Sequence, residues 1–183
     1  NQIFEHMPSM SQYKLISERY TYSSTRAEIY ILHLFIKHKN QDRILNLNQV
    51  GSGISFVLPV LTELLNNSPA FIEEPELHLH PAAQAELSDS VIAALNSGKM
   101  IVIETHSEHL ILRLLRRIRE SSESKISEYD PLYLKSEDLN FYYFNIDEMG
   151  HTDVKKIRSS PSGDFLDVWP NGFFPERERE LFN

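Results

Sequence analysis

Along the middle of this chain, short runs of apolar residues alternate with stretches in which apolar residues recur at helical spacing. Short apolar runs at residues 70–72 and 100–103 are each followed by a stretch with helical spacing, from Pro81 to Gly98 and from Ser107 to Glu120. Strands that are apolar on both faces are typical of parallel sheets covered by helices. The order strand, helix, strand, helix therefore predicts an α/β fold of three layers, in which helices flank a parallel sheet.

The segments before this core predict further elements. Residues 25–39 place their apolar side chains at helical spacing, residues 43–48 are short and alternating enough for a strand, and residues 54–65 predict a helix that contains Pro59. We expect residues 1–48 to form a helical or lid segment that leads into a domain at residues 49–120.

In the last third of the chain, the alternation of apolar runs and helical stretches ends. Residues 140–146 and 152–157 predict two strands of a hairpin, with Gly150 in the turn. The tail that follows mixes aromatic residues, proline and charge. We expect residues 121–183 to form a small hairpin with an aromatic cap.

Composition narrows the functional classes. Hydrophobic residues make up 41% and charged residues 24% of the 183 residues, as in ordinary globular proteins. The net charge of −8 argues against a domain devoted to nucleic acid. No apolar run approaches the roughly 18 residues of a membrane span. The absence of cysteine excludes disulfides and thiolate metal sites and favours a cytoplasmic location.

Two adjacent acids, Glu73 and Glu74, follow the apolar run at residues 70–72. Carboxylates at the end of a buried strand are costly unless they hold a metal or face a reacting group. Ligands of α/β folds bind at that edge of the sheet. The pair therefore predicts a division of labour, in which one acid supports Mg²⁺ and its neighbour orients and deprotonates a water.

The segment FIEEPELHLHP at residues 71–81 resembles the Walker B and D-loop segment of ABC-type ATPases, especially in the OLD-like and repair-related branch. The resemblance implies a P-loop NTPase of ABC type, with ATP and Mg²⁺ as cofactors. It makes Glu73 the metal-supporting acid, where many members have Asp, and Glu74 the catalytic carboxylate. Residues 77–80 then match the D-loop, which crosses the dimer interface in the family, and place His80 near the nucleotide.

Two further segments fit the same resemblance. IVIETHS at residues 101–107 resembles the switch or H-loop, in which His106 would contact the γ-phosphate and sense its loss. Residues 50–55 stand in the place of the ABC signature, whose glycine amides and helix N-terminus bind the γ-phosphate of the opposite subunit. The signature positions here are Gly51, Ser52, Gly53 and Ser55; Gly51 replaces the usual serine, which leaves Ser52 or Ser55 to supply the hydroxyl.

A phosphate-binding loop is missing from these residues. The only Gly-Lys pair, Gly98-Lys99, is followed by methionine, so the pattern G-x-x-x-x-G-K-[ST] does not occur. The resemblance therefore implies that this chain alone does not hydrolyse ATP and that an N-terminal ATPase half precedes residue 1. The whole would be a nucleotide-gated homodimer for DNA repair or phage defence, working with a nuclease or another effector. The alternative is a degenerate ATPase fold that serves as a non-catalytic interaction module.

Three smaller features complete the sequence-based expectations. Residues 169–174 resemble the W-P-x-G-F close of a family of predicted bacterial ATPases, and their aromatic residues Trp169, Phe173 and Phe174 predict a lid over a sheet edge. Histidine pairs at 78 and 80 and at 106 and 109 leave a zinc site as an alternative. One helix carries Arg113, Arg116 and Arg117 on a shared face, which is either a solvated surface or a nucleic-acid contact.

Overall fold

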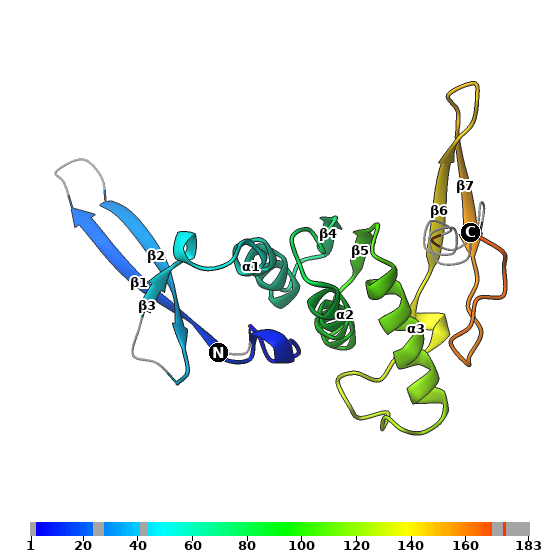
Figure 1. The fold of residues 1–183 in the computed structure, drawn as a ribbon, viewed down its shortest axis with the longest axis horizontal. Helices are drawn as coiled ribbons and strands as arrows, with labels where there is room; N and C mark the ends of the chain where they lie inside the picture. The colour runs from blue at the N-terminus through cyan, green and yellow to red at the C-terminus, as the bar shows by residue number, and fades with distance from the viewer. Residues whose placement is uncertain (1–2, 24–27, 41–43, 170–173, 175–183) are drawn as a thin grey trace, which may run out of the picture. The chain divides into compact units, whose positions relative to one another are not determined.

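The computed structural model describes residues 3–23, 28–40, 44–169 and 174. The chain divides into two compact units, residues 1–110 and 111–183. The first unit contains a three-stranded sheet and then an α/β stretch, and the second contains a hairpin (Figure 1). The boundaries expected after residues 48 and 120 remain predictions.

The first part of the chain forms an antiparallel sheet. Its elements are, in order, the 3₁₀ helix η1 (Pro8–Met10), β1 (Tyr13–Ser23), β2 (Glu28–His38), β3 (Ile44–Asn46) and the 3₁₀ helix η2 (Leu47–Gln49). β2 lies between β1 and β3 in the sheet. The register of β1 and β2 runs from Tyr13 opposite His38 to Ser23 opposite Glu28. β3 lies within the strand that the sequence predicts at residues 43–48.

The helix expected over residues 25–39 is wrong, and so is the helical character expected for residues 1–48, because β2 fills this stretch. Ile29, Ile31 and Phe35 stand at alternating positions, so the same apolar residues also fit a strand. β-branched and aromatic residues favour strands. Pairing along the whole of β1 then gives β2 partners for its backbone hydrogen bonds on one side. The apolar spacing within residues 25–39 does not contain this pairing.

The α/β stretch follows as the sequence predicts. Its elements are α1 (Ser52–Leu65), β4 (Ala70–Glu73), α2 (Pro81–Asn96), β5 (Ile101–Glu104) and α3 (Glu108–Ser122), which continues into the second unit. β4 and β5 pair in parallel, with Ala70 opposite Ile101. α1 contacts β4 and α2, and the fully buried Val57, Leu87 and Ile92 form the core. The α/β fold with parallel strands flanked by helices is confirmed (Figure 1).

One face of the β4–β5 pair is exposed. Side chains alternate between the faces of a strand, so Phe71 and Glu73 share one face of β4 and Ala70 lies on the other. Ala70 is fully buried, whereas Phe71, Val102 and Met100 are 72%, 51% and 56% exposed. The described residues therefore cover the pair on one side and leave an apolar surface on the other.

A buried lysine joins the end of α1 to the start of β5. The Lys99 side chain is 2% exposed. Its Nζ donates to the main-chain carbonyls of Glu63 at 2.7 Å, Asn66 at 3.1 Å and Ser68 at 2.5 Å, and to Asn66 Oδ1 at 2.7 Å. The last carbonyls of a helix have no partner within the helix and are stabilised by a cation. Lys99 therefore acts as a C-terminal cap supplied by a distant part of the sequence.

The second unit contains the rest of α3 and the predicted hairpin. Its remaining elements are the 3₁₀ helix η3 (Ser136–Asp138), β6 (Phe141–Ile146) and β7 (Thr152–Ile157). β6 and β7 pair in antiparallel register, with Phe141 opposite Ile157. Gly150 adopts a φ of 83° in the turn that joins them, a conformation that glycine tolerates best.

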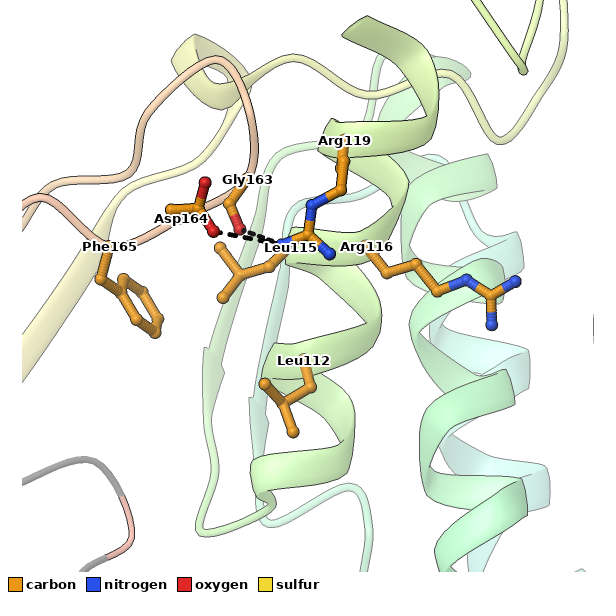
Figure 2. A pocket seen from close by; sticks show the side chains of 7 residues that line it. All are labelled: Leu112, Leu115, Arg116, Arg119, Gly163, Asp164 and Phe165. Carbon is orange, nitrogen blue, oxygen red and sulfur yellow. Dashed lines mark hydrogen bonds and ion pairs between the residues drawn. The ribbon is translucent and has the colours of Figure 1, made fainter. Parts of the chain in front are cut away.

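The loop after β7 docks on α3 through a close backbone approach. Gly163 has a φ of 73°, and a Cβ atom at this position would lie 2.2 Å from the carbonyl oxygen of Leu115. Figure 2 shows Arg119 reaching this loop, where its guanidinium donates to Gly163 O and Asp164 Oδ1, each at 3.2 Å. These residues line a cavity of about 240 Å³ together with Leu112, Arg116 and Phe165.

The described part of the aromatic tail packs on the hairpin. The Trp169 ring meets the Tyr143 ring of β6 edge-on with centroids 5.9 Å apart, and it contacts Phe165 at 5.2 Å. The expected lid thus rests, at Trp169, on β6 and on the loop that follows β7. Phe173 lies outside the described residues.

Candidate functional site

Two acids meet at the carboxyl end of the parallel pair. Glu73 closes β4, Glu104 closes β5, and the two residues are direct partners in the register. Both are exposed, on the same face as Phe71 and Val102. Because parallel strands end at the same edge of a sheet, the two local sequences IEE and IETH deliver their polar side chains to one place.

Glu74 stands immediately beyond β4 in a strained conformation. Its φ is 45°, in the left-handed region that residues with a Cβ rarely adopt. Its N–H still donates to the carbonyl oxygen of Glu104 at 2.9 Å, so the parallel pairing holds the backbone up to this residue. The side chain is 41% exposed. Strain of this kind is kept only where the surrounding structure enforces it, and it is concentrated at functional sites.

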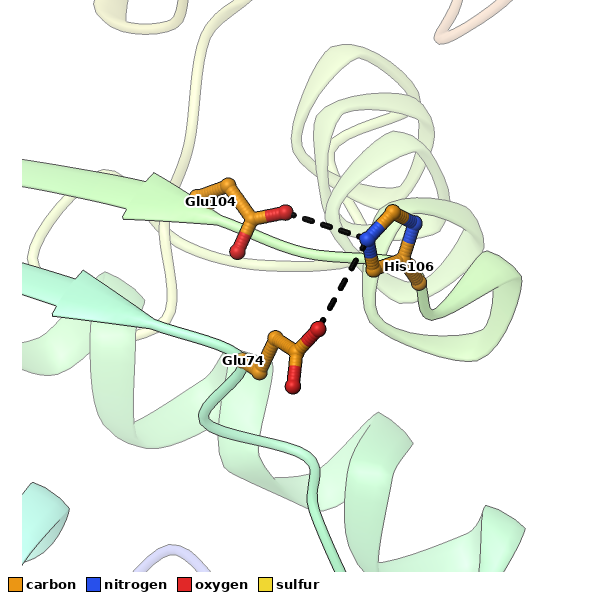
Figure 3. Close-up of side chains that lie close together, drawn as sticks. All are labelled: Glu74, Glu104 and His106. Carbon is orange, nitrogen blue, oxygen red and sulfur yellow. Dashed lines mark ion pairs between the residues drawn. The ribbon is translucent and has the colours of Figure 1, made fainter.

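His106 lies between the two acids. Its Nε2 is 3.2 Å from Glu104 Oε1 and 3.7 Å from Glu74 Oε1, and its side chain is 78% exposed (Figure 3). Ser107 immediately precedes α3, and its Oγ accepts the N–H of Leu110 at 3.1 Å, as the side chain of an N-cap does. The structure therefore brings together the two residues that the sequence predicts as catalytic.

The chemistry of this cluster suits a divalent cation. Among the described residues, Glu74, Glu104 and His106 form a group whose potential ligand atoms all lie within 4.8 Å of one another. Glu73, the predicted metal ligand, lies outside this group, but it is directly opposite Glu104 in the register of β4 and β5. Carboxylate oxygens are the ligands that Mg²⁺ prefers, so the donors at this edge fit the ion that the resemblance implies.

The zinc alternative rests on the histidine pairs at 78 and 80 and at 106 and 109. His106 is in the group described above, but within the described parts of the chain His78, His80 and His109 are not.

Some of the predicted signature and D-loop residues line a separate cavity of about 350 Å³. They are Gly51, Gly53, His78 and His80. Gly53 approaches His78 so closely that a Cβ atom would lie 3.0 Å from the His78 carbonyl oxygen. This close contact explains why a glycine stands at that position.

The side chains of this second group are partly engaged in capping. His80 is the N-cap of α2, and its Nδ1 accepts the N–H of Ala82 at 3.3 Å. The Ser55 hydroxyl donates to the carbonyl of Leu47 at 3.0 Å. Ser52 is exposed at the first position of α1, so it is the more accessible of the two hydroxyls. The nucleotide-binding roles of these residues remain predictions.

The arginine cluster on α3 is paired with a carboxylate. Arg116 Nε and Arg117 each donate to Glu120 at 2.7 Å. Partial burial raises the pKa of Glu120, but the hydrogen bonds from both arginines outweigh it and leave the pKa below its usual value. Arg113 also has an interaction partner. The nucleic-acid contact stays a prediction; unchanged DNA affinity and salt dependence in Arg116→Glu would contradict it.

The sequence alone does not identify two residues of the site, Glu104 and Glu76. Glu104 belongs to the H-loop segment, but only the register shows it beside Glu73. Glu76 has no predicted role, yet it is 8% exposed, and its Oε1 accepts the backbone N–H of His106 at 2.7 Å. A usable signal for Glu104 is an acid that ends a second apolar strand. The sequence offers no comparable signal for Glu76.

No helix within the described residues combines the length and the apolar character that a membrane crossing requires.

Two known proteins are similar to parts of this chain. The Old nuclease of Escherichia phage P2 is 39% identical over 46 residues, a stretch that covers 25% of this chain and only 8% of that protein. A solved structure from work on the ATP-driven dimerization and DNA-stimulated activation of SMC ATPases is similar with a TM-score of 0.46 and 9% identity. That similarity covers 76% of this chain and 73% of the other.

A family described as an AAA ATPase domain matches residues 2–111. The matched range contains Glu73, Glu74, Glu104 and His106. Together with the similarity to Old nuclease, it confirms the resemblance to P-loop ATPases of the OLD-like branch. Because this match covers more than half of the 183 residues, the chain belongs to the AAA ATPase domain family.

Proposed function

We propose that this chain supplies the catalytic carboxylate and the phosphate-sensing histidine of an ABC-type ATPase. The proposed enzyme works as a nucleotide-gated dimer in DNA repair or phage defence. The observation that carries the proposal is the convergence of Glu74, Glu104 and His106 at the carboxyl edge of two parallel strands (Figure 3). Family membership supports ATP as the substrate.

The proposed reaction assigns a role to each side chain. The Glu74 carboxylate orients a water and takes a proton from it as the water oxygen attacks the γ-phosphorus. The bond between that phosphorus and the bridging oxygen of ADP then breaks. His106 donates a hydrogen bond to a γ-phosphate oxygen. Because both side chains are partly exposed at the edge, they can reach a ligand that arrives from solvent.

Mg²⁺ would be held at this edge by Glu73, directly or through water, with Glu104 as the paired acid. When bound, the ion neutralises negative charge that develops on the phosphates. The two carboxylates occupy directly opposite positions in the register.

A phosphate-binding loop has to come from another segment or chain, because these residues contain none. We propose that the half that carries it packs on the exposed face of β4 and β5. That face is apolar at Phe71, Met100 and Val102 and ends in Glu73 and Glu104. Exposed contiguous apolar surface marks interaction sites. The cavity lined by Gly51, Gly53 and His80 would face the nucleotide of the partner subunit.

The test is ATP turnover by a polypeptide that contains residues 1–183 and the P-loop half. Glu74→Gln should reduce turnover by about 100-fold or more, while ATP-dependent dimers persist because a carboxylate that repels the γ-phosphate is gone. Glu63→Gln, near the end of α1 and with its side chain 40% exposed, is the matched control and should turn over like the wild type. Equal turnover in Glu74→Gln and wild type, or none in either, would favour the non-catalytic interaction module.

A further inference from the structure

Glu76 differs from every other acid at the site in its burial. The residue is 8% exposed, whereas the side chains of Glu74 and Glu104 are 41% and 53% exposed. Its Oε1 accepts the backbone N–H of His106 at 2.7 Å, across 30 positions of sequence. A hydrogen bond to a carboxylate at this distance belongs to the stronger, charge-assisted class.

The second oxygen of Glu76 makes the burial costly. Oε2 is buried and has no hydrogen-bond partner among the described residues. A buried acceptor without a partner destabilises the folded state, and more so when it belongs to a carboxylate. An apolar side chain of the same size would avoid this cost. Stability alone therefore does not explain why a carboxylate stands at position 76.

The backbone around Glu76 links the two loops of the site. The N–H of Leu77 donates to the carbonyl of Glu74 at 3.2 Å, and the N–H of Leu79 donates to the carbonyl of Glu76 at 3.0 Å. These bonds make residues 74–79 a compact turn that begins at the strained Glu74. The side chain of Glu76 extends from this turn to the backbone of His106, so the two loops are joined at one point.

We propose that Glu76 is a positioning residue: its carboxylate fixes the backbone of His106 so that the imidazole stays beside Glu74 and Glu104. The role in turnover rests on the proposed ATPase function, whereas the contact itself does not. Because the contact needs only an acceptor oxygen at that reach, glutamine should replace glutamate. Methionine fills a similar volume without the oxygen and should not.

The first measurement is amide hydrogen exchange in the ¹⁵N-labelled chain by NMR. In Glu76→Met the His106 amide should exchange about 10- to 100-fold faster, as expected for the loss of a hydrogen bond to a charged group. In Glu76→Gln it should stay within about threefold of the wild type. The Ser107 amide, which donates to Thr105 Oγ1 at 3.0 Å, is the internal control and should not change. Equal exchange at His106 in the wild type and Glu76→Met would overturn the proposal.

The second measurement separates positioning from stability. Glu76→Met should unfold at the same denaturant concentration as the wild type or a higher one, since it removes the buried unpartnered oxygen. In the polypeptide with the P-loop half, it should nevertheless lose about 10- to 100-fold in kcat, with KM for ATP nearly constant. Glu76→Gln should retain most of the turnover. Equal losses in both variants would show that the charge matters, not the acceptor, and would refute the positioning role.

The two measurements can fail separately. If the wild type shows no turnover, the proposed ATPase function fails, and the exchange rate of the His106 amide still decides whether Glu76 holds that loop. If turnover follows the proposed function and His106 exchange is insensitive to position 76, only the role of Glu76 is refuted.

Discussion

Replacing Lys99 by methionine should destabilise the first unit more than any exposed lysine substitution. Methionine keeps most of the apolar stem but removes the ammonium, so the carbonyls of Glu63, Asn66 and Ser68 lose their shared donor. The lysine side chain is almost fully buried. Water therefore cannot take its place without opening the end of α1.

The magnitude follows from two opposing contributions. An ammonium has three N–H donors, and each hydrogen bond with a charged group contributes about 1.5–3 kcal/mol. Dehydrating the ammonium costs several kcal/mol and offsets much of this gain. The ion pair with Glu63 adds little, because its atoms are 3.9 Å apart and that carboxylate is 40% exposed. We expect Lys99→Met to lower the free energy of unfolding by about 2–4 kcal/mol.

The assay is urea unfolding followed by far-UV circular dichroism. For a unit of this size, the loss corresponds to a decrease in Tm of about 10 °C. Lys39→Met is the matched control, since Lys39 is exposed and belongs to the same unit; it should change stability by less than about 0.5 kcal/mol. Glu63→Gln should cost less than about 1 kcal/mol. A Lys99→Met variant as stable as Lys39→Met would refute the capping role of the buried ammonium.

Two further predictions concern the second unit. Gly163→Ala should lower the stability of this unit by about 3–5 kcal/mol in a thermal melt, because the new methyl group would meet the Leu115 carbonyl and φ is positive. The control is Gly150→Ala, where φ is positive but the space is open. It should lower the stability by only about 1 kcal/mol in the same measurement. Hydrogen bonds from the Arg158 side chain and backbone hold the pKa of Asp167 well below its usual value. This stabilisation is complete above the unfolded pKa near 3.9 and is lost as the pH falls towards the folded value. Asp167→Asn should therefore lose less stability than the wild type between about pH 5 and pH 2, and parallel acid-unfolding curves would contradict the pairing.

The sequence by itself determines the elements whose signals are local. The start of α2 at Pro81, the parallel strands at residues 70–73 and 101–104 and the hairpin around Gly150 follow from periodicity, proline and glycine within a few positions. The same holds for Glu74 and His106. Their places at the ends of two apolar strands determine which edge of a parallel sheet they occupy.

The tertiary structure decides what depends on distant partners. Residues 28–38 form a strand because β1 pairs with them, although their apolar spacing also fits a helix. Glu76 is buried and accepts the N–H of the distant His106, whereas the equally charged Glu73 stays exposed. Phe71 looks like a core residue, yet its face of the sheet has no covering layer in the described chain. Local patterns record which backbone conformation a segment prefers. They do not show which neighbouring segment completes its hydrogen bonds or covers its surface. For these residues, that neighbour decides the secondary structure or the burial.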